Sequence, residues 1–275
     1  TKTVWHDVQA WGVEGKGWTD TATYFDRLPA GAKSKVPLPV WNLSRQSAGL
    51  SVQFETNATE IWFEYELLSS QMALPHMPAT GVSGIDLYAK VDDDNFRWLA
   101  CTKPTEQNDQ VKVIGSLPRT TKHFMAYLPL YNGMKSLRIG VPANEGIEFV
   151  GLAPRSTSPV VFYGTSITQG ACASRPGMAH AAILGRRLDR PTINLGFSGN
   201  GKMELALAEV LGEIDACLYV IDCLPNMNAE LVSERTVPFV TRLRELRPET
   251  PIILVEDRTY GNSWALPSRK QRQDS

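Results

Sequence analysis

The sequence predicts two domains, an all-β sandwich or jelly roll over residues 1–155 and an α/β domain with a parallel sheet over residues 156–275. Apolar and polar residues alternate along short segments up to about residue 155, whereas short apolar strands alternate with helical stretches after it. A length of 275 residues accommodates two such domains. We place the boundary near "RSTSP", where the rhythm changes.

The period-two alternation is clearest in "IWFEYEL", where Ile61, Phe63, Tyr65 and Leu67 share one face of the expected strand. No helical stretch is expected in this half, so many short strands in succession predict a sandwich or jelly roll. The further expected strands are "LSVQFET", "GIDLYAKV", "FRWLACT", "FMAYLPLY", "SLRIGVP" and "IEFVGLA".

The second half predicts right-handed βαβ crossovers and a parallel sheet covered on both faces. A helix opened by Pro176 is expected to carry Gly177, Ala181, Leu184 and Leu188 on one face. Ligands of such sheets bind outside the carboxyl ends of the strands, which makes the loops after the strands the candidate site. Strands are expected at 160–163, 192–195, 216–221 and 252–256, with further helices near 203–211 and over 229–246.

The loops after these strands read "GTSITQG", "GFSGNGK", "DCLPNMN" and "EDRTY". Ser166 is a candidate nucleophile, and the helix after it would direct its positive N-terminal end toward a developing oxyanion. Gly199 can bring its backbone N–H close to a ligand because it has no side chain, and Asn226 can donate from its side-chain NH₂. Asn226 could instead cap the following helix, a role that Asn228 fits better. Together the three residues predict a nucleophile with an oxyanion hole.

The first three loops resemble the first three sequence blocks of the Ser-Gly-Asn-His (SGNH) hydrolases, also called GDSL lipases and esterases. The usual Gly-Asp-Ser core is here Gly164-Thr165-Ser166, a variant seen in carbohydrate esterases of that superfamily. "GIDLY" resembles the Gly-x-Asp-Leu-Tyr (GxDLY) signature of a β-sandwich that often precedes such a hydrolase. The resemblance implies a flavodoxin-like three-layer α/β domain. It also implies that Ser166 is the nucleophile, with its own N–H, the Gly199 N–H and Asn226 as oxyanion donors.

The family's catalytic base lies in an Asp-x-x-His motif near the C-terminus, and none of His6, His76, His123 and His180 stands in such a motif. For His180 we expect a packing or surface role. A complete domain of this type has roughly 180 to 200 residues, whereas 120 residues make up 156–275. We therefore expect a domain truncated at its C-terminus, an Asp/His pair beyond residue 275, and very weak catalysis without that pair.

The resemblance implies a serine esterase that removes small acyl groups, acetyl above all, from an acylated carbohydrate or another small ester. Two alternatives stay open: a carbohydrate-binding pseudoenzyme, and a lipase or thioesterase for longer acyl chains. The candidate substrate contacts are Arg175, Cys172, Thr165 and Glu256. Arg175 could equally be a solvated loop charge, and Glu256 could pair with Arg258. The segments "WNLSRQSAG" and "ALPHMPATG" are candidates for contacts from the N-terminal half to the site.

Composition limits the partners. The net charge of −1 and the isoelectric point near 6.4 give no electrostatic case for binding nucleic acid or an anionic membrane surface. No apolar run approaches the roughly 20 residues of a membrane helix, and neither metal nor organic cofactor is expected. The four cysteines form no C-x-x-C pair and are expected to be buried thiols. The chain lacks a starting Met, so we expect a secreted or periplasmic protein whose leader was removed; a cytoplasmic location and an oligomer stay open.

Overall fold

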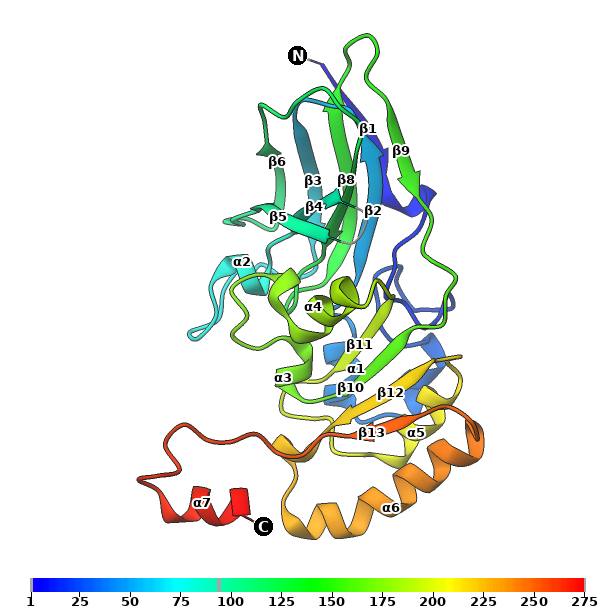
Figure 1. Ribbon diagram of the computed structural model, residues 1–275, viewed down its shortest axis with the longest axis vertical. Coiled ribbons are helices and arrows are strands. Elements are labelled where there is room, and N and C mark those ends of the chain that lie inside the picture. The colour runs from blue at the N-terminus through cyan, green and yellow to red at the C-terminus, as the bar shows by residue number, and fades with distance from the viewer. Residues whose placement is uncertain (1, 93–94, 275) are drawn as a thin grey trace.

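The computed structural model describes residues 2–92 and 95–274. The molecule is elongated, with a β-sandwich at one end and a parallel sheet with helices at the other (Figure 1). The predicted combination of an all-β half and an α/β half is therefore confirmed.

Two antiparallel sheets form the sandwich. Their aromatic and aliphatic side chains meet in one core, in which the Phe54 and Phe124 rings stack with centroids 5.2 Å apart. One sheet has the order β1 (Thr3–Asp7), β8 (Met134–Pro142), β3 (Ile61–Leu67), β6 (Asn108–Ile114). The other has the order β5 (Asn95–Cys101), β4 (Asp86–Asp92), β7 (Lys122–Tyr127), β2 (Ser51–Thr56), β9 (Phe149–Leu152).

Strand β3 follows its sequence pattern, since every second residue from Ile61 to Leu67 is buried. Strands β1 and β6 were not expected from the sequence. Both are edge strands of the first sheet, and their residues are only half-buried or exposed. An edge strand buries few side chains, which leaves a weak apolar signal in a segment such as "NDQVKVI".

The expectation that the first half holds no helix was wrong. Helix α1 (Leu38–Ser44) follows two short 3₁₀ turns, η1 (Val8–Ala10) and η2 (Ala30–Ser34), and α2 (Ala79–Val82) adds one turn. Pro37 and Pro39 at the start of α1 obscured it, although proline is well tolerated in a first helical turn. Val40 and Trp41 of this helix are buried with the apolar residues of the parallel sheet, not with those of the sandwich.

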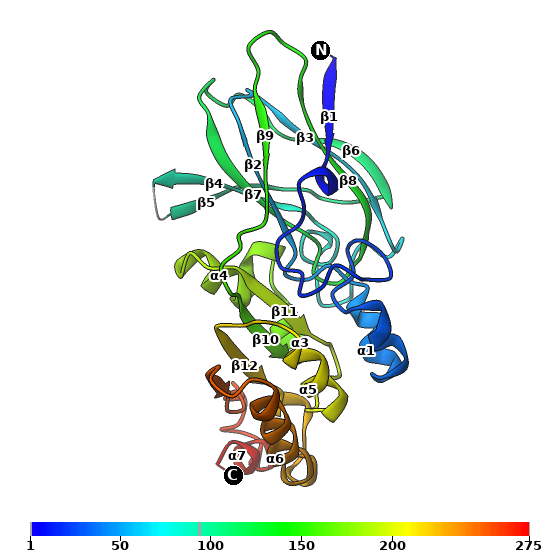
Figure 2. The same ribbon diagram turned by 90° about the vertical axis from the view of Figure 1, so that its right-hand side faces the viewer.

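The second half contains the predicted parallel sheet, in the order β11 (Thr192–Gly196), β10 (Val160–Gly164), β12 (Leu218–Asp222), β13 (Ile252–Leu254). Helices cover both faces: Phe162 of β10 packs with Ala181 of α4, whereas Tyr163 stacks on Phe239 of α6. The helical elements are α3 (Ser166–Gln169), η3 (Pro176–Met178), α4 (His180–Arg187), α5 (Leu205–Gly212), η4 (Leu224–Asn226), α6 (Ala229–Leu246) and α7 (Pro267–Asp274). Figure 2 shows α5 and α6 side by side below the sandwich.

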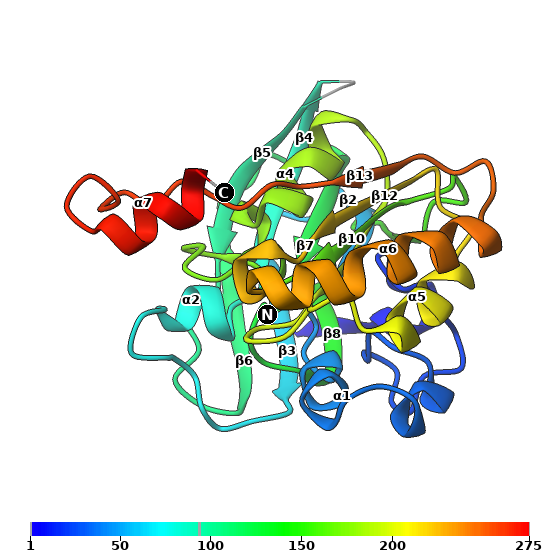
Figure 3. The same ribbon diagram turned by 90° about the horizontal axis from the view of Figure 1, so that it is seen from below.

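The helix expected from Pro176 is divided into the turn η3 and helix α4. Gly177 and Ala181 are buried as the expected face requires, but Leu184 and Leu188 are 37% and 59% exposed. The division shifts the buried face, so that Ala182 and Gly185 pack inward. Helix α7 lies apart from the sheet (Figure 3). Within residues 2–92 and 95–274, no helix is long and apolar enough to cross a membrane.

Candidate active site

Strands β10, β11 and β12 end at the same level, because Gly164 pairs with Gly196 on one side and Asp222 on the other. Glycine lets the following turn pack directly against these ends. A Cβ on Gly164 would meet Thr168 Oγ1 at 2.2 Å, and a Cβ on Gly196 would meet the Gln169 nitrogen at 2.1 Å. The turn after β10 therefore packs directly against the ends of β10 and β11.

Ser166 is the first residue of α3, which has a single turn, and its side chain is half-buried. Thr165 before it is fully buried, and its hydroxyl caps the turn by accepting from the Ile167 N–H. The Ser166 carbonyl accepts hydrogen bonds from the Gly170 and Ala171 N–H groups. The sequence argument placed Ser166 in a loop and relied on the dipole of the helix after it. Because Ser166 instead begins a single turn, local N–H groups and not a full macrodipole would act on an oxyanion.

Gly199 lies in the loop after β11 with a φ of +69°, and a Cβ there would meet no atom within 4 Å. The position therefore favours glycine for its left-handed backbone. Neighbouring residues fix the loop against β10: the Phe197 N–H donates to the Gly164 carbonyl, and the Ser198 N–H donates to Gln169 Oε1 at 2.9 Å.

Asn226 lies in η4 after β12, where its Nδ2 donates to the Asn200 carbonyl at 2.7 Å. An amide nitrogen carries two hydrogens, so this bond leaves a second donor. Asn228 caps α6 by accepting from the Leu231 N–H at 2.9 Å, as the sequence suggested. The buried Asp222 accepts from Thr168 Oγ1 at 3.0 Å and so connects the end of β12 to α3.

The four predicted substrate contacts occupy different environments. Thr165 is the buried cap described above. Arg175 lies over the Trp98 ring, 4.8 Å from its centroid, with Nε 3.4 Å from Asp86 Oδ2, so it is not a solvated loop charge. Cys172 is exposed with a φ of +61°. Glu256 is exposed, and the ion pair expected for it with Arg258 is instead made by Asp257 at 3.1 Å.

The N-terminal half reaches the loops around Ser166 through both predicted segments. The Gln169 side-chain amide donates to Gln46 Oε1, and Thr80 Oγ1 donates to the Ser174 carbonyl at 2.6 Å. Sequence reasoning missed Tyr131. Its hydroxyl donates to the Ser166 carbonyl at 3.4 Å, and burial raises the pKa of this hydroxyl. An aromatic residue in the loop "LPLYNG" was the available signal.

Asp86, in the "GIDLY" segment, is fully buried between the two halves. Its Oδ2 accepts from the Gly177 N–H and its Oδ1 from Trp98 Nε1, both at 2.9 Å. Burial raises the pKa of this carboxyl to about 6, although the hydrogen bond from Gly177 and the charge of Arg175 oppose the shift. Asp86 thus holds the segment that follows the Ser166 loop.

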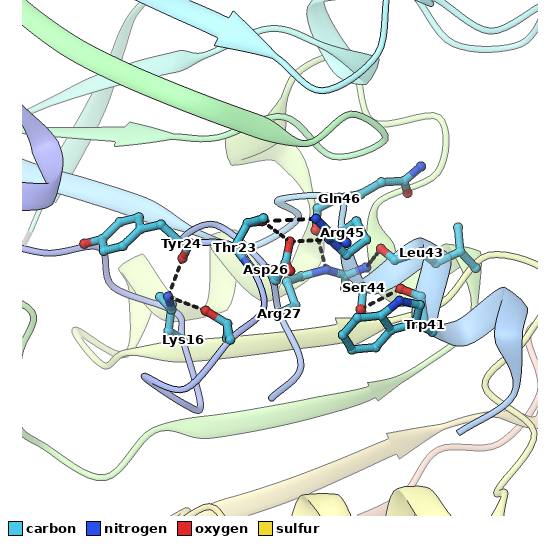
Figure 4. Close-up of polar contacts among 11 residues, drawn as sticks. Lys16, Thr23, Tyr24, Asp26, Arg27, Trp41, Leu43, Ser44, Arg45 and Gln46 are labelled. Atoms are coloured by element: carbon cyan, nitrogen blue, oxygen red, sulfur yellow. Dashed lines mark hydrogen bonds and ion pairs between the residues drawn. The ribbon is translucent and has the colours of Figure 1, made fainter. Parts of the chain in front are cut away.

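Arg27 is a second buried connection between the halves. Figure 4 shows its contacts within the N-terminal half. Its guanidinium donates to the carbonyls of Gln46 and Leu43 at 2.7 Å each. It also donates to two carbonyls of β11, those of Asn194 and Gly196, at 2.9 Å each. Burial lowers the pKa of Arg27 to about 9, which leaves the side chain cationic at neutral pH.

The four histidines lie as follows. His6 stacks on Phe149 with centroids 3.9 Å apart, His123 Nε2 bonds Gln53 Oε1 at 2.8 Å, and His76 is exposed. His180 packs edge-on against Phe162 with centroids 5.6 Å apart, which confirms the expected packing role, and burial lowers its pKa.

All four cysteines are free thiols. The expectation of buried thiols holds for Cys223, but Cys172 is exposed because it lies at the outer turn of the loop after α3. Within residues 2–92 and 95–274, no three His, Cys, Asp or Glu side chains gather in a metal-binding arrangement.

Two family models match the chain: the GDSL-like lipase/acylhydrolase family over residues 157–275, and the N-terminus of SGNH-hydrolase-type esterases over residues 3–147. A crystal structure assigned as a GDSL-like lipase from Bacteroides ovatus is 33% identical, with a TM-score of 0.92 over 99% of this chain and 80% of that one. No curated protein sequence matches significantly.

Two more distant structures share the fold. The salicylyl-acyltransferase SsfX3 from a tetracycline biosynthetic pathway is 18% identical, with a TM-score of 0.66 over 91% of this chain and 71% of that one. A family two carbohydrate esterase from Cellvibrio japonicus is 11% identical, with a TM-score of 0.59 over 100% of this chain and 86% of that one.

A GxDLY-type sandwich joined to a parallel sheet with three glycine- and amide-rich strand ends defines the class of SGNH-type carboxylic ester hydrolases. The chain belongs to the GDSL-like lipase/acylhydrolase family, as the match over residues 157–275 and the 33% identity with the Bacteroides ovatus protein show.

Proposed function

We propose that this protein is a serine esterase that removes acetyl and other small acyl groups from carbohydrate. Ser166 is the nucleophile, and the N–H groups of Ser166 and Gly199 with the Asn226 side chain form the oxyanion hole. An Asp/His pair, which the family resemblance implies, takes and returns the proton. A carbohydrate polymer as substrate favours a location outside the cytoplasm.

The observation that supports this proposal best is the hydrogen bond from Asn226 to the Asn200 carbonyl at 2.7 Å. It ties the loop after β12 to the loop that carries Gly199. That loop is in turn bound to α3, because the Ser198 N–H donates to Gln169 Oε1. The three candidate groups therefore belong to one connected set of contacts, as an oxyanion hole requires.

The proposed reaction proceeds by acyl transfer. Ser166 Oγ attacks the ester carbonyl as its proton passes to the histidine, and the carbonyl oxygen becomes an oxyanion held by the three donors. Collapse of this intermediate returns the proton to the leaving sugar hydroxyl and leaves an acyl-serine. Water, deprotonated by the same base, then releases the acid and restores Ser166.

The preference for small acyl groups follows from the family resemblance, and two small residues near Ser166 are consistent with it. Ala171 and Ala173, which flank Cys172 in the loop after α3, are small and half-buried. Ala173 and Tyr131 both pack against the buried cluster of Ala48, Leu130 and Ala179. The carbohydrate esterase from Cellvibrio japonicus shares the fold, which makes a carbohydrate ester a reasonable first substrate.

Acetate release from acetylated xylan by the full-length protein tests the proposal, with Ser166→Ala as control. We expect release by the wild type and none above background by the variant. p-Nitrophenyl acetate should be hydrolysed faster than p-nitrophenyl octanoate. Preference for the octanoate would favour a lipase, and equal rates in the wild type and Ser166→Ala would exclude Ser166 as nucleophile.

The oxyanion role of Asn226 is tested with a neighbouring asparagine as control. Asn226→Asp keeps the shape but removes the NH₂ donor, so kcat should fall by about 10²–10³-fold. Asn228→Ala removes the α6 cap and should lower the melting temperature while kcat stays near the wild-type value. Similar kcat values for the two variants would contradict the assignment.

A further inference from the structure

A hollow of about 150 Å³ lies in the N-terminal half beside the Ser166 loop. Two of its lining residues also contact that loop: Tyr131 is the hydrogen-bond donor to the Ser166 carbonyl, and Gln46 accepts from Gln169. Helix α2, which contributes Val82 to the lining, lies on the same side of the molecule as α3 (Figure 1). A ligand in the hollow would therefore lie beside residues that contact the turn carrying Ser166.

The lining of this hollow is neutral and rich in amides. None of its ten residues carries a formal charge, so an anionic or cationic ligand would meet no counterion there. Amide and hydroxyl groups both donate and accept hydrogen bonds, as the hydroxyls of a sugar do. The polar lining residues are Asn42, Gln46, Ser69, Gln71, Tyr131 and Asn132.

The side chain of Asn132 fixes one wall of the hollow through four hydrogen bonds. Its Oδ1 accepts from the Ser69 and Gly133 N–H groups, and its Nδ2 donates to the Ser69 carbonyl and to Ser83 Oγ, at 2.9–3.0 Å. These four bonds use its full capacity. Asn42 and Gln71 are exposed at the rim, so their amide groups are placed to receive a ligand.

Apolar residues complete the lining, where Leu68, Leu74 and Val82 face the same space. A sugar ring presents C–H groups as well as hydroxyls, so a pocket with amides and aliphatic side chains suits it. The volume holds several water molecules, at about 30 Å³ each, and hence one such ring.

We infer that this hollow, built by the N-terminal half, is a subsite for the hydroxyl-bearing sugar ring whose ester is presented to Ser166. The inference rests on the proposed esterase function and assigns the alcohol side of the ester to the sandwich half.

The test uses Asn42→Ala combined with Gln71→Ala in the full-length protein. The matched control is Asn108→Ala combined with Gln110→Ala, two exposed amide residues on β6. The ratio of kcat/KM for acetylated xylo-oligosaccharides to that for p-nitrophenyl acetate should fall by about tenfold in the first variant, because neutral hydrogen bonds to the ring hydroxyls are lost. The control should keep the wild-type ratio, and an unchanged ratio in the first variant would overturn the inference.

A binding measurement separates this inference from the proposed function. Ser166→Ala protein is titrated with unesterified xylo-oligosaccharide by calorimetry, with and without the Asn42/Gln71 changes. Binding that is lost with these changes supports the subsite even if no esterase activity is found. Absence of binding, or equal binding with and without the changes, overturns the subsite even if acetate release depends on Ser166.

Discussion

The Gly177 N–H donates to Asp86 Oδ2 at 2.9 Å, across 91 residues of sequence and from one half of the molecule to the other. The same carboxylate accepts from Trp98 Nε1 and lies 3.4 Å from Arg175 Nε. A residue of the "GIDLY" segment thus fixes the chain that follows the Ser166 loop. The sandwich therefore supports the segment next to the candidate active site.

Asp86→Ala should destabilise this connection strongly. It leaves the Gly177 N–H and Trp98 Nε1 without their acceptor in a buried place, at a cost of about 1–3 kcal/mol for each donor. Asp86→Asn keeps one acceptor oxygen and should recover part of the loss. Hydrogen exchange of the Gly177 amide measures the effect, with Asp20→Ala, an exposed aspartate, as control. Exchange as slow as in the wild type would show that Asp86 does not hold this segment.

The pH dependence of stability should also reveal Asp86. Its pKa is raised from 3.8 to about 6 by burial, so between about pH 4 and pH 6 the folded state binds this proton more tightly than the unfolded state. The contribution of Asp86 to the free energy of unfolding is therefore full below pH 4 and is lost as the pH rises through 6. The difference in unfolding free energy between wild type and Asp86→Asn should shrink over that window. Parallel curves from pH 4 to pH 7 would contradict the raised pKa.

Local patterns predicted much of this structure. The alternation from Ile61 to Leu67 is a property of one strand, and burial in the structure follows it. The candidate site loops were recognisable because glycines and amides directly follow apolar strands, as at Gly164 and Asn226. These signals need only a few neighbouring residues.

Contacts between distant segments could not be predicted in this way. Arg27 donates to the carbonyl of Asn194, 167 residues away, and no local pattern identifies a buried arginine as a connection between the halves. The packing of Val40 and Trp41 could not be predicted either, because their helix packs against the parallel sheet, whose strands lie far along the chain. Tyr131 reaches Ser166 only because the two halves are stacked.

Gly177 is predicted to tolerate no side chain. A Cβ there would lie 2.4 Å from the ring of Tyr88, which is itself covered by Arg186 at 4.2 Å from the ring centroid. Gly177→Ala should cost about 1–3 kcal/mol of stability through overpacking. Gly31→Ala is the control, since a Cβ at Gly31 meets nothing within 4 Å. Urea denaturation of both variants checks the prediction, and equal midpoints would refute it.

Arg27 should be required for the stable junction of the two halves. Arg27→Met removes a donor from four carbonyl oxygens: those of Asn194 and Gly196 in buried contacts, and those of Leu43 and Gln46 in partly buried ones. The expected loss is about 2–6 kcal/mol, because each of the two buried carbonyls left without this donor costs about 1–3 kcal/mol. Arg27→Lys should recover only part of this, because an ammonium has three donors and lacks the planar fork. Arg97→Lys, at an exposed arginine, is the control for the same chemical change. Denaturation midpoints measured by circular dichroism check this prediction. A lysine variant as stable as the wild type would show that the charge alone, and not the contacts with four carbonyls, holds β11 in place.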